Sequence, residues 1–430
     1  MRLLRDLILL FGLLLVAPWR SRSRRHLQRL WPSLQPCQAS GPRIVVHAVS
    51  LGEVNASAKL VRELLQLGLD VVCSSTTLSG QQRSRELHPN TSHMEWPLDI
   101  SFCCRRWLDH VNPDVLVLVE LEVWPTLVSM ANKRGIQVLV VNGRLSPRSF
   151  KKSMRWKSLL HDGYASLHRV FAQSEEDAIR FVQMGVAEDR IAVHSNLKWD
   201  REPAPSEEVE AIRAALRLDP DRPLVLFASS APEEHQLFAK SIPFSWQAVV
   251  APRRPEWFDD ALQTFPNARL RTDSHATGDT VVLNTLGELD AVFPLADVVV
   301  MGRSFGPRHG SDPMGPAAAG RPILIGPNHG DFSPAVKLLK AAGALQVVVA
   351  DELSTRVSEI AGCRKTLERM GNAGYRVAEA SRGVAGMIAG EVALHTQPPR
   401  RDRGGAEEKE ESVHQDAPST SAHGGTHGHK

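Results

Sequence analysis

The chain has 430 residues, which is enough for two domains and additional terminal segments. Its 51 Lys and Arg residues nearly balance its 48 Asp and Glu residues, so the overall charge gives no reason to expect binding to nucleic acid. The five cysteines show no CxxC and no spacing with histidine that suits zinc, and we interpret them as free thiols in a reducing compartment.

Basic charge is concentrated at the N-terminus. Residues 1–34 contain seven Arg and one Asp, and they include the uncharged apolar run Leu7–Ala17. As a helix this run would span about 16 Å of the roughly 30 Å hydrocarbon layer. Pro18 and an arginine cluster stand where a secretory signal would have its cleavage site. We therefore predict that 1–34 is an uncleaved membrane anchor with its arginines on anionic headgroups of the inner leaflet. A buried N-terminal helix is the alternative.

Residues 42–200 alternate between short apolar runs and helical patterns. Val54–Leu67 has apolar residues at helical spacing, and 114–119 is almost wholly apolar, as expected of a strand buried on both faces. The predicted strands are 43–47, 70–74, 114–119, 136–141 and 169–172. This alternation predicts an α/β domain with a doubly wound, Rossmann-like parallel sheet.

The alternation stops at a Pro-rich linker, 201–222, and then begins again. The second predicted domain, 223–395, ends in a helical region at 354–393. Its predicted strands are 224–228, 247–251, 280–283, 297–301, 322–325 and 345–349. Two α/β domains of similar size joined by a linker predict a cleft between them. The polar, aromatic-free segment 396–430 is expected to be disordered.

Glu53 is the strongest candidate for chemistry in the first domain. It follows the first predicted strand through the turn at Ser50–Gly52 and begins a helix. Ligands of open α/β sheets bind at the carboxyl ends of the strands, where a carboxylate can take a proton from a substrate. The alternative is a carboxylate that only complements the helix dipole.

Two further carboxylates, Glu120 and Glu122, follow the strand 114–119. Neighbouring strand ends would bring Glu120 close to Glu53 and raise one pKa into the range of a general base. Glu122 fits equally well as a helix cap or an ion-pair partner. Arg144 follows the next predicted strand and Lys198 lies at the end of the first domain, and either cation could neutralise an anionic substrate or leaving group. An ordinary surface ion pair is the alternative for both cations.

Four turns in the second domain suit a nucleotide. Ser229–Ser230 precedes a helix N-terminus, and Arg253 is suited to bidentate contact with a phosphate. The other turns are 284–288 and the glycine-rich 302–316. There is no GxxxxGK[ST], no GxGxxG after the first strand and no HExxH, so P-loop, dinucleotide-binding and zinc-protease classes lose support.

The order of these motifs is specific. They are the blocks His47–Glu53, Glu120–Pro125, Asn142–Ser146, Asn196–Asp200, Pro252–Arg253 and Thr285–Leu289. In order and spacing they resemble the 3-deoxy-D-manno-octulosonic acid (Kdo) transferases of lipopolysaccharide assembly. The resemblance extends from the N-terminal segment to about residue 390.

The resemblance implies a GT-B glycosyltransferase with two Rossmann-like domains facing across a cleft. It implies inverting transfer of Kdo from CMP-Kdo to a lipid A precursor (lipid IVA-like) at the cytoplasmic face of the inner membrane, without a metal or another cofactor. Glu53 matches the family's general base, and Glu120 and Lys198 match positions that stabilise the transition state. The positions that match contacts to CMP are Pro252, Arg253, Leu286, Gly287 and Glu288.

The chain departs from the family in the donor motif Asp312, Pro313, Met314 and Gly315. Asp312 replaces an Asn, and Gly315 replaces a Glu that would hold the ribose hydroxyls. Ala231 and Pro232 likewise replace a His and a Glu. Loss of one ribose carboxylate would cost on the order of 1–3 kcal/mol of nucleotide affinity unless another group, with Asp312 as the candidate, replaces it.

These departures leave two alternatives to Kdo transfer. One is a GT-B transferase that uses another nucleotide sugar. The other is a non-catalytic, membrane-anchored homologue that binds nucleotide or lipid. The joint presence of Glu53, Glu120 and Lys198 argues against the non-catalytic alternative.

Overall fold

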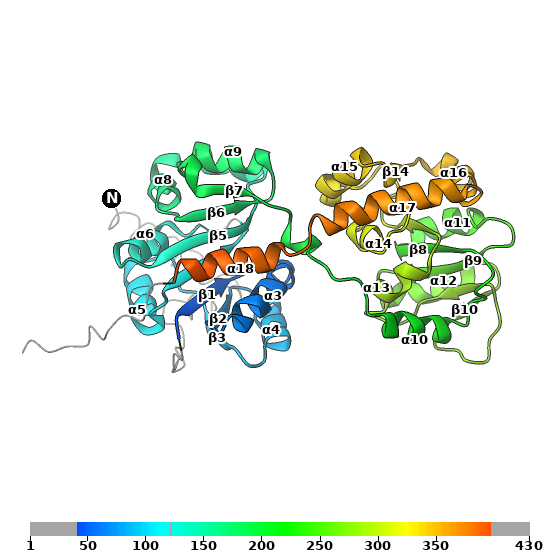
Figure 1. Cartoon of the computed structure of the whole chain (residues 1–430), viewed down its shortest axis with the longest axis horizontal. Helices are drawn as coiled ribbons and strands as arrows, with labels where there is room; N and C mark the ends of the chain where they lie inside the picture. Colours follow the sequence, from blue (N-terminus) through cyan, green and yellow to red (C-terminus); the bar gives the residue numbers. More distant parts are fainter. Residues whose placement is uncertain (1–40, 121–122, 397–430) are drawn as a thin grey trace, which may run out of the picture.

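The computed structural model describes residues 41–120 and 123–396, which form two α/β domains side by side (Figure 1). The predicted anchor at 1–34, Glu122 and the predicted disordered tail from residue 397 onward lie outside the described residues. Among the helices of 41–120 and 123–396, none is both long enough and apolar enough to cross a bilayer.

A seven-stranded parallel sheet forms the centre of the first domain. Its strands are β1 (Arg43–His47), β2 (Asp70–Ser75), β3 (Ser92–Glu95), β4 (Val115–Val119), β5 (Gln137–Gly143), β6 (Arg169–Ala172) and β7 (Ile191–Val193). They lie in the order β3-β2-β1-β4-β5-β6-β7. Val45 of β1 pairs in register with Val72 of β2 and Leu116 of β4. The order reverses between β1 and β4, which is where sheets of this kind bind ligands.

Helices cover both faces of this sheet because each has an apolar stripe to bury. They are α3 (Leu51–Gln66), α4 (Leu78–Leu87), α5 (Ser101–Val111), α6 (Pro125–Lys133), α7 (Pro147–Met154), α8 (Lys157–Ala165) and α9 (Glu175–Met184). Leu60 and Leu64 of α3 belong to one apolar cluster, whereas Trp107 of α5 and Leu127 of α6 belong to another. The sheet is therefore buried on both faces, as its apolar strands require.

The second domain repeats this architecture. Its strands are β8 (Leu224–Ser230), β9 (Gln247–Pro252), β10 (Ala268–Leu270), β11 (Thr280–Val282), β12 (Val298–Met301), β13 (Ile323–Ile325) and β14 (Leu345–Val347). All are parallel, in the order β10-β11-β9-β8-β12-β13-β14. Its helices are α10 (Ser206–Leu216), α11 (Pro232–Lys240), α12 (Phe258–Thr264), α13 (Leu289–Val292), α14 (Met314–Ala318), α15 (Ser333–Ala341), α16 (Leu353–Ala361) and α17 (Arg364–Glu379).

The predicted doubly wound sheet is confirmed in both domains, and each predicted strand is present. The sequence pattern does not predict β3, β7 and β10, which are edge strands. Edge strands are short and bury few side chains, so they leave little apolar signal. In β3, for example, only Met94 is buried.

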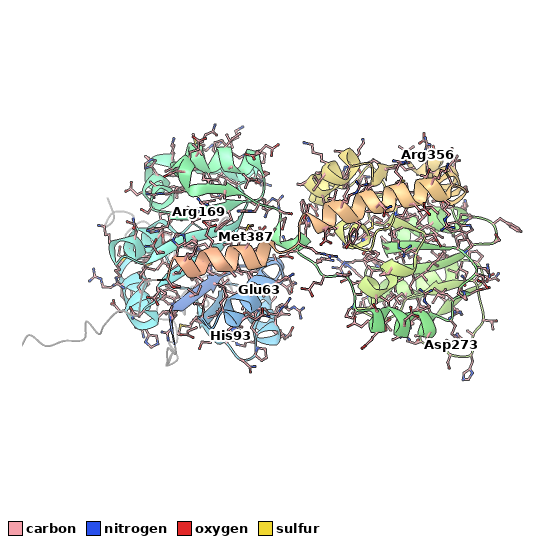
Figure 2. All side chains as sticks on the ribbon, viewed as in Figure 1. Glu63, His93, Arg169, Asp273, Arg356 and Met387 are labelled. Atoms are coloured by element: carbon pink, nitrogen blue, oxygen red, sulfur yellow. The ribbon has the colours of Figure 1, made fainter. Side chains whose placement is uncertain are left out.

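The last helix, α18 (Val384–Leu394), differs from the predicted boundary of the second domain. The sequence pattern places residues up to 395 in that domain, but α18 packs against α3 of the first domain (Figure 1). Val384, Ile388 and Val392 belong to the first domain's core. Figure 2 shows Met387 on this helix near Arg169, which forms an ion pair with Glu391 at 2.6 Å. A helix this apolar must be buried, but its sequence does not show which sheet it covers.

Asp200 links the two chain segments that cross between the domains. Its fully buried carboxylate accepts hydrogen bonds from the backbone N–H groups of Gly383 (3.0 Å) and Ala385 (2.7 Å), at the start of α18. It also forms an ion pair with Nζ of Lys59, on α3, at 3.0 Å. Asp200 therefore caps α18 from the linker and ties that helix to α3.

We expect Asp200→Ala to destabilise the protein by about 2–4 kcal/mol, because it leaves two helix N–H groups unpaired and removes the buried partner of the Lys59 ammonium. The measurement is the shift of the urea unfolding midpoint. Glu202→Ala is the matched control: Glu202 pairs with the same Lys59 Nζ at 3.1 Å but is 77% exposed, so its loss should leave the midpoint unchanged. Equal midpoints for the two variants would contradict the capping role.

Candidate active site

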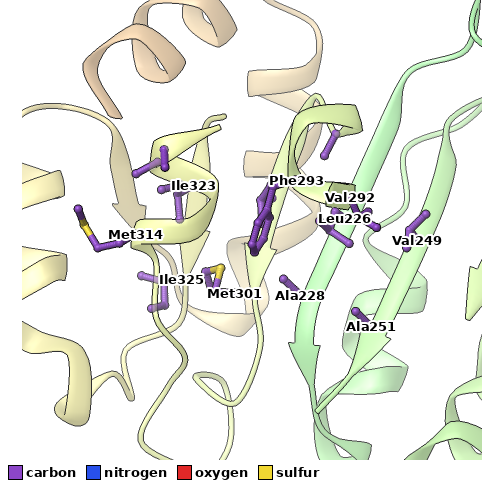
Figure 3. Packing of buried hydrophobic residues seen from close by; sticks show 14 of the residues in the cluster. Leu226, Ala228, Val249, Ala251, Val292, Phe293, Met301, Met314, Ile323 and Ile325 are labelled. Carbon is purple, nitrogen blue, oxygen red and sulfur yellow. The ribbon is translucent and has the colours of Figure 1, made fainter. Parts of the chain in front are cut away.

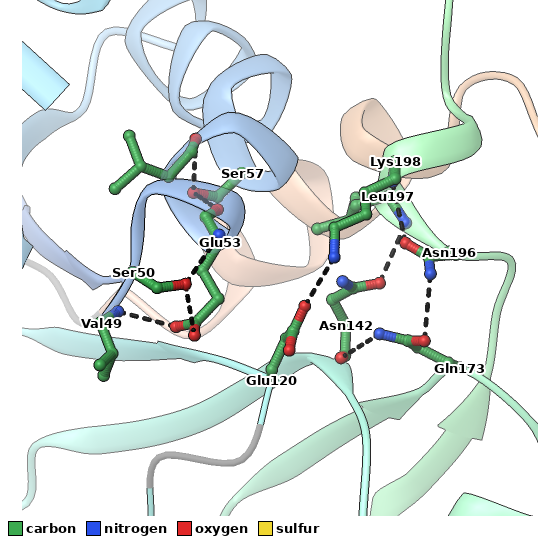
Figure 4. Close-up of polar contacts among 11 residues, drawn as sticks. Val49, Ser50, Glu53, Ser57, Glu120, Asn142, Gln173, Asn196, Leu197 and Lys198 are labelled. Carbon is green, nitrogen blue, oxygen red and sulfur yellow. Dashed lines mark hydrogen bonds and ion pairs between the residues drawn. The ribbon is translucent and has the colours of Figure 1, made fainter. Parts of the chain in front are cut away.

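The first group of candidate residues lies at the carboxyl edge of the first sheet, where β1 and β4 are neighbours. Glu53 is in the first turn of α3, after β1, and Glu120 directly follows β4. Lys198 belongs to a short 3-10 helix, Leu197–Trp199, at the beginning of the linker. Figure 4 shows the three side chains at this edge. The structure thus brings Glu53, Glu120 and Lys198 together, as the sequence predicts.

Glu53 is held in a helix cap. Ser50 is the N-cap of α3, and its Oγ accepts from the N–H of Glu53 at 3.3 Å. The Glu53 carboxylate accepts in return from the Val49 N–H (2.7 Å) and the Ser50 hydroxyl (3.0 Å). This reciprocal arrangement resembles a capping box, so Glu53 also stabilises the start of α3.

The environment of Glu53 also suits a base. Burial raises the pKa of Glu53 above its ordinary value, and the charge of Glu120 adds to the increase. The hydrogen bonds from Val49 and Ser50 and the charge of Lys198 act in the opposite direction. A half-buried carboxylate with a raised pKa and a fixed orientation is suited to act as a base.

Glu120 and Lys198 form an ion pair, with 3.0 Å between Oε1 and Nζ. The Glu120 side chain is 19% exposed and that of Lys198 is 40% exposed, so a ligand can reach the pair. Glu120 has φ of 63°, a left-handed backbone conformation that is rare outside glycine. Strain of this kind is concentrated at functional sites, because the surrounding structure must hold it in place.

A polar network behind this pair positions Lys198 (Figure 4). Asn142, at the end of β5, accepts from the Leu197 N–H through Oδ1 at 3.0 Å, and its carbonyl accepts from Nε2 of Gln173 at 2.9 Å. Gln173 accepts in turn from Nδ2 of Asn196 at 3.1 Å, and Asn196 Oδ1 accepts from the Lys198 N–H at 3.0 Å. No motif or strand-end carboxylate in the sequence marks Gln173 as a candidate.

The predicted CMP contacts lie at the carboxyl edge of the second sheet. Pro252 ends β9, and Arg253 follows it with its N–H donating to the carbonyl of Ser230 at 3.0 Å. Gly287 has φ of 90°, and Leu286 beside it is 69% exposed. Glu288 pairs with Arg271 at 2.9 Å and accepts from the Thr285 hydroxyl. The Glu288 carboxylate therefore holds this turn, and the backbone of the turn is left to meet a ligand.

The donor motif 312–315 is buried except at Asp312, which is partly exposed. Asp312 accepts from the Met314 N–H at 3.0 Å, and its Oδ2 lies 3.5 Å from Nη2 of Arg201. Burial raises the pKa of Asp312, and Arg201 opposes that increase. The Met314 side chain is in the second-domain core (Figure 3), so only its backbone can face a ligand. Pro313 is the N-cap of α14.

The ring of Phe293 explains why residue 315 is glycine. A Cβ added at Gly315 would lie 2.6 Å from Cε2 of Phe293, which is too close for two carbon atoms. Phe293 is 4% exposed and belongs to the same core cluster as Met314 (Figure 3). The ring therefore closes the space that a glutamate at this position would need.

We expect Gly315→Ala to destabilise the protein by about 1–3 kcal/mol, because the added methyl group forces the Phe293 ring from its packed position. The measurement is the thermal unfolding midpoint. Gly390→Ala on α18 is the matched control: its Cβ would meet nothing within 4 Å. The control should raise stability by about 0.5–1 kcal/mol, since alanine is the better helix former. An unchanged midpoint in Gly315→Ala would contradict the packing explanation.

A serine–histidine–aspartate chain, buried at its serine and histidine and exposed at its aspartate, lies at the carboxyl end of β8. Ser230 Oγ is 3.0 Å from Nε2 of His235, and Nδ1 of His235 is 2.5 Å from Oδ2 of Asp260. This order matches a hydrolase triad. Ser230 and His235 are both 0% exposed, however, so no substrate can reach the hydroxyl. We interpret the chain as support for the end of β8.

These features define the class of the protein. Two doubly wound domains are joined by a linker. Glu53 and the Glu120–Lys198 ion pair lie at the carboxyl edge of the first sheet, and Arg253 lies at the carboxyl edge of the second. The same two-domain fold occurs in a glycosyltransferase from Rickettsia africae ESF-5, with a TM-score of 0.56 and 14% identity, covering 83% of this chain and 98% of that chain. The fold is therefore GT-B-like.

Sequence comparison gives the family. The profile of the family described as "3-Deoxy-D-manno-octulosonic-acid transferase (kdotransferase)" matches residues 19–201. The 3-deoxy-D-manno-octulosonic acid transferase of Bordetella pertussis is 30% identical over 366 residues, which cover 76% of this chain and 83% of the relative. That of Haemophilus influenzae is 28% identical over 364 residues, covering 79% and 84%. The chain belongs to the Kdo transferase family, and its class is glycosyltransferase.

Proposed function

We propose that the protein transfers Kdo from CMP-Kdo to a lipid A precursor such as lipid IVA, with inversion and without a metal, using Glu53 as general base. The observation that carries the proposal is the pairing of a half-buried Glu53 of raised pKa with the adjoining Glu120–Lys198 ion pair at one sheet edge. A base alone would fit many reactions. The family identifies which one to propose.

The reaction is a single displacement. An acceptor hydroxyl donates its proton to the Glu53 carboxylate while its oxygen attacks the anomeric carbon of Kdo. The bond from that carbon to the CMP phosphate breaks, and CMP leaves with the electron pair. Direct attack opposite the leaving group inverts the anomeric centre. Lys198, oriented by Glu120, supplies positive charge where negative charge develops, and Arg253 holds the phosphate.

Helix α7 supports a site of action at a membrane surface. Residues 144–161 contain six Lys and Arg and no Asp or Glu. The α7 helix buries none of its residues, and the apolar side chains of Met154, Trp156 and Leu159 are 39%, 60% and 38% exposed. Basic residues interleaved with exposed apolar ones are typical of contact with anionic lipid. We therefore propose the cytoplasmic face of the inner membrane as the location, with the 1–34 segment as anchor.

The direct test of the proposal is incubation of the purified full-length chain with CMP-Kdo and a tetra-acylated lipid A precursor. We expect a lipid product whose mass has increased by one or more Kdo residues. Gly315 stands where the resemblance predicts a glutamate, and the Phe293 ring fills the space that its side chain would need. The missing carboxylate favours one alternative, a transferase of another nucleotide sugar. Calorimetry with CMP, UDP and GDP separates the two, because preference for UDP or GDP would overturn the CMP-Kdo proposal.

Replacing Lys198 or Glu120, the two charged neighbours of Glu53, should shift the pH dependence of transfer in opposite directions. Protonated Glu53 cannot act as base, so kcat/KM should fall as pH drops through its raised pKa. Lys198→Gln removes a charge that lowers this pKa, so the acidic limb should move to higher pH. Glu120→Gln removes a charge that raises it, so the limb should move to lower pH. Shifts of the same sign in both variants would contradict the assignment.

A further inference from the structure

Three arginines gather at the carboxyl edge of the second sheet. Arg253 follows β9 and Arg303 follows β12, and both strands pair with β8 between them. Arg308 lies five residues along the same loop as Arg303. Burial lowers the pKa of Arg303, and the charges of Arg253 and Arg308 act in the same direction, whereas the carboxylates of Asp331 and Glu234 oppose the shift.

Among the three guanidinium groups, that of Arg308 forms a direct ion pair. Arg308 forms an ion pair with Glu233 at 2.5 Å and lies over the ring of Trp257 at 4.6 Å. In the described part of the chain, neither Arg253 nor Arg303 has an ion pair or a hydrogen bond from its guanidinium. Two guanidinium groups without an ion pair, at the ends of strands on either side of β8, favour an anionic ligand at this edge.

The backbone around Arg303 is fixed in a rare conformation. Arg303 has φ of 60°, which is uncommon outside glycine. The buried Glu234 carboxylate accepts from three consecutive N–H groups, those of Arg303 (2.6 Å), Ser304 (2.8 Å) and Phe305 (2.9 Å). A Cβ at Gly302 would meet the Ser230 backbone at 2.6 Å, so this loop lies directly against the end of β8. The loop is therefore rigid, and it holds a strained arginine where ligands bind in such sheets.

We propose that Arg303 binds the second anionic group of the donor, the carboxylate of its acidic sugar, while Arg253 binds the phosphate. This rests on the proposed function, because a CMP-linked sugar acid carries one phosphodiester and one carboxylate. Two free guanidinium groups then meet two anionic groups. A nucleoside diphosphate also presents two anionic groups, so the test must separate a carboxylate from a second phosphate.

The experiment measures the affinities for CMP and CDP and the transfer of Kdo from CMP-Kdo in Arg303→Gln, with Arg253→Gln for comparison. Arg356→Gln on α16 removes the same charge from an exposed site in the second domain (Figure 2) and serves as control. We expect Arg303→Gln to bind CMP within about twofold of the control and to raise the KM for CMP-Kdo at least tenfold. Arg253→Gln should weaken CMP itself. Circular dichroism and the unfolding midpoint verify that each variant is folded.

Three outcomes would overturn the assignment. The first is an unchanged KM for CMP-Kdo in Arg303→Gln. The second is a loss of CMP affinity as large as that in Arg253→Gln, which would make Arg303 a contact of the first phosphate. The third is a selective loss of CDP affinity, which would identify the second anion as a phosphate. If the wild type binds CMP but transfers no Kdo, the proposed function fails, and the CDP comparison still tests Arg303 directly.

Discussion

Replacing Glu53 by glutamine is expected to lower kcat for Kdo transfer by about 10²–10⁴-fold, the usual contribution of a general base. The fold should be unaffected, because glutamine can occupy the capping-box position at the start of α3 as glutamate does. The affinity for CMP should also be unchanged, since the predicted nucleotide contacts are in the other domain. The measurements are kcat from the transfer assay and the urea unfolding midpoint.

This substitution separates the two roles of Glu53. Glu207→Gln is the control: Glu207 is also in the first turn of a helix, α10, but it is exposed and is not one of the candidate site residues. If Glu53 only caps α3, then Glu53→Gln and Glu207→Gln should both retain kcat. Retained turnover in a folded Glu53→Gln protein would remove Glu53 as the base.

The second large effect is expected from the Glu120–Lys198 pair. Lys198→Gln and Glu120→Gln should each lower kcat/KM by about 10²–10³-fold, because the pair presents oriented charge to the transition state. The double variant should be little worse than either single one, since the two groups act as a unit. The measurement is a double-mutant cycle on kcat/KM.

Arg83 and Glu86 provide the matched control for that cycle. They form an ion pair at 3.2 Å on α4, but their side chains are 40% and 49% exposed. The same substitutions there should leave kcat/KM unchanged, singly and together. Additive losses at Glu120 and Lys198 would show that the two side chains act separately and would contradict their shared role.

The elements that could be predicted from the sequence are those with strong local patterns. The strand β4 is five consecutive buried apolar residues, and the turn after it carries Glu120, so both the sheet and the edge with the candidate site follow from composition and order. Glu53, Glu120 and Lys198 could be grouped because parallel strands end at one edge. Their grouping did not require any knowledge of side-chain contacts.

Other features depend on long-range packing and leave no local pattern. The apolar sequence of α18 requires burial, but only the tertiary structure places it on the first domain. Gln173 acts through Asn142 and Asn196, which are distant in sequence. The glycine at 315 is explained by the ring of Phe293, and the backbone of Arg303 is held by Glu234. Each of these features depends on contact with a second segment that is distant in sequence.

The measurement that tests the central claim most directly is the stoichiometry of the reaction. CMP release and lipid-linked Kdo are measured in the same mixture of wild-type protein, CMP-Kdo and tetra-acylated lipid A precursor. Glycosyl transfer predicts one lipid-linked Kdo for each CMP released, and release of CMP that depends on the acceptor. CMP release without a lipid product, or no release at all, would contradict the account.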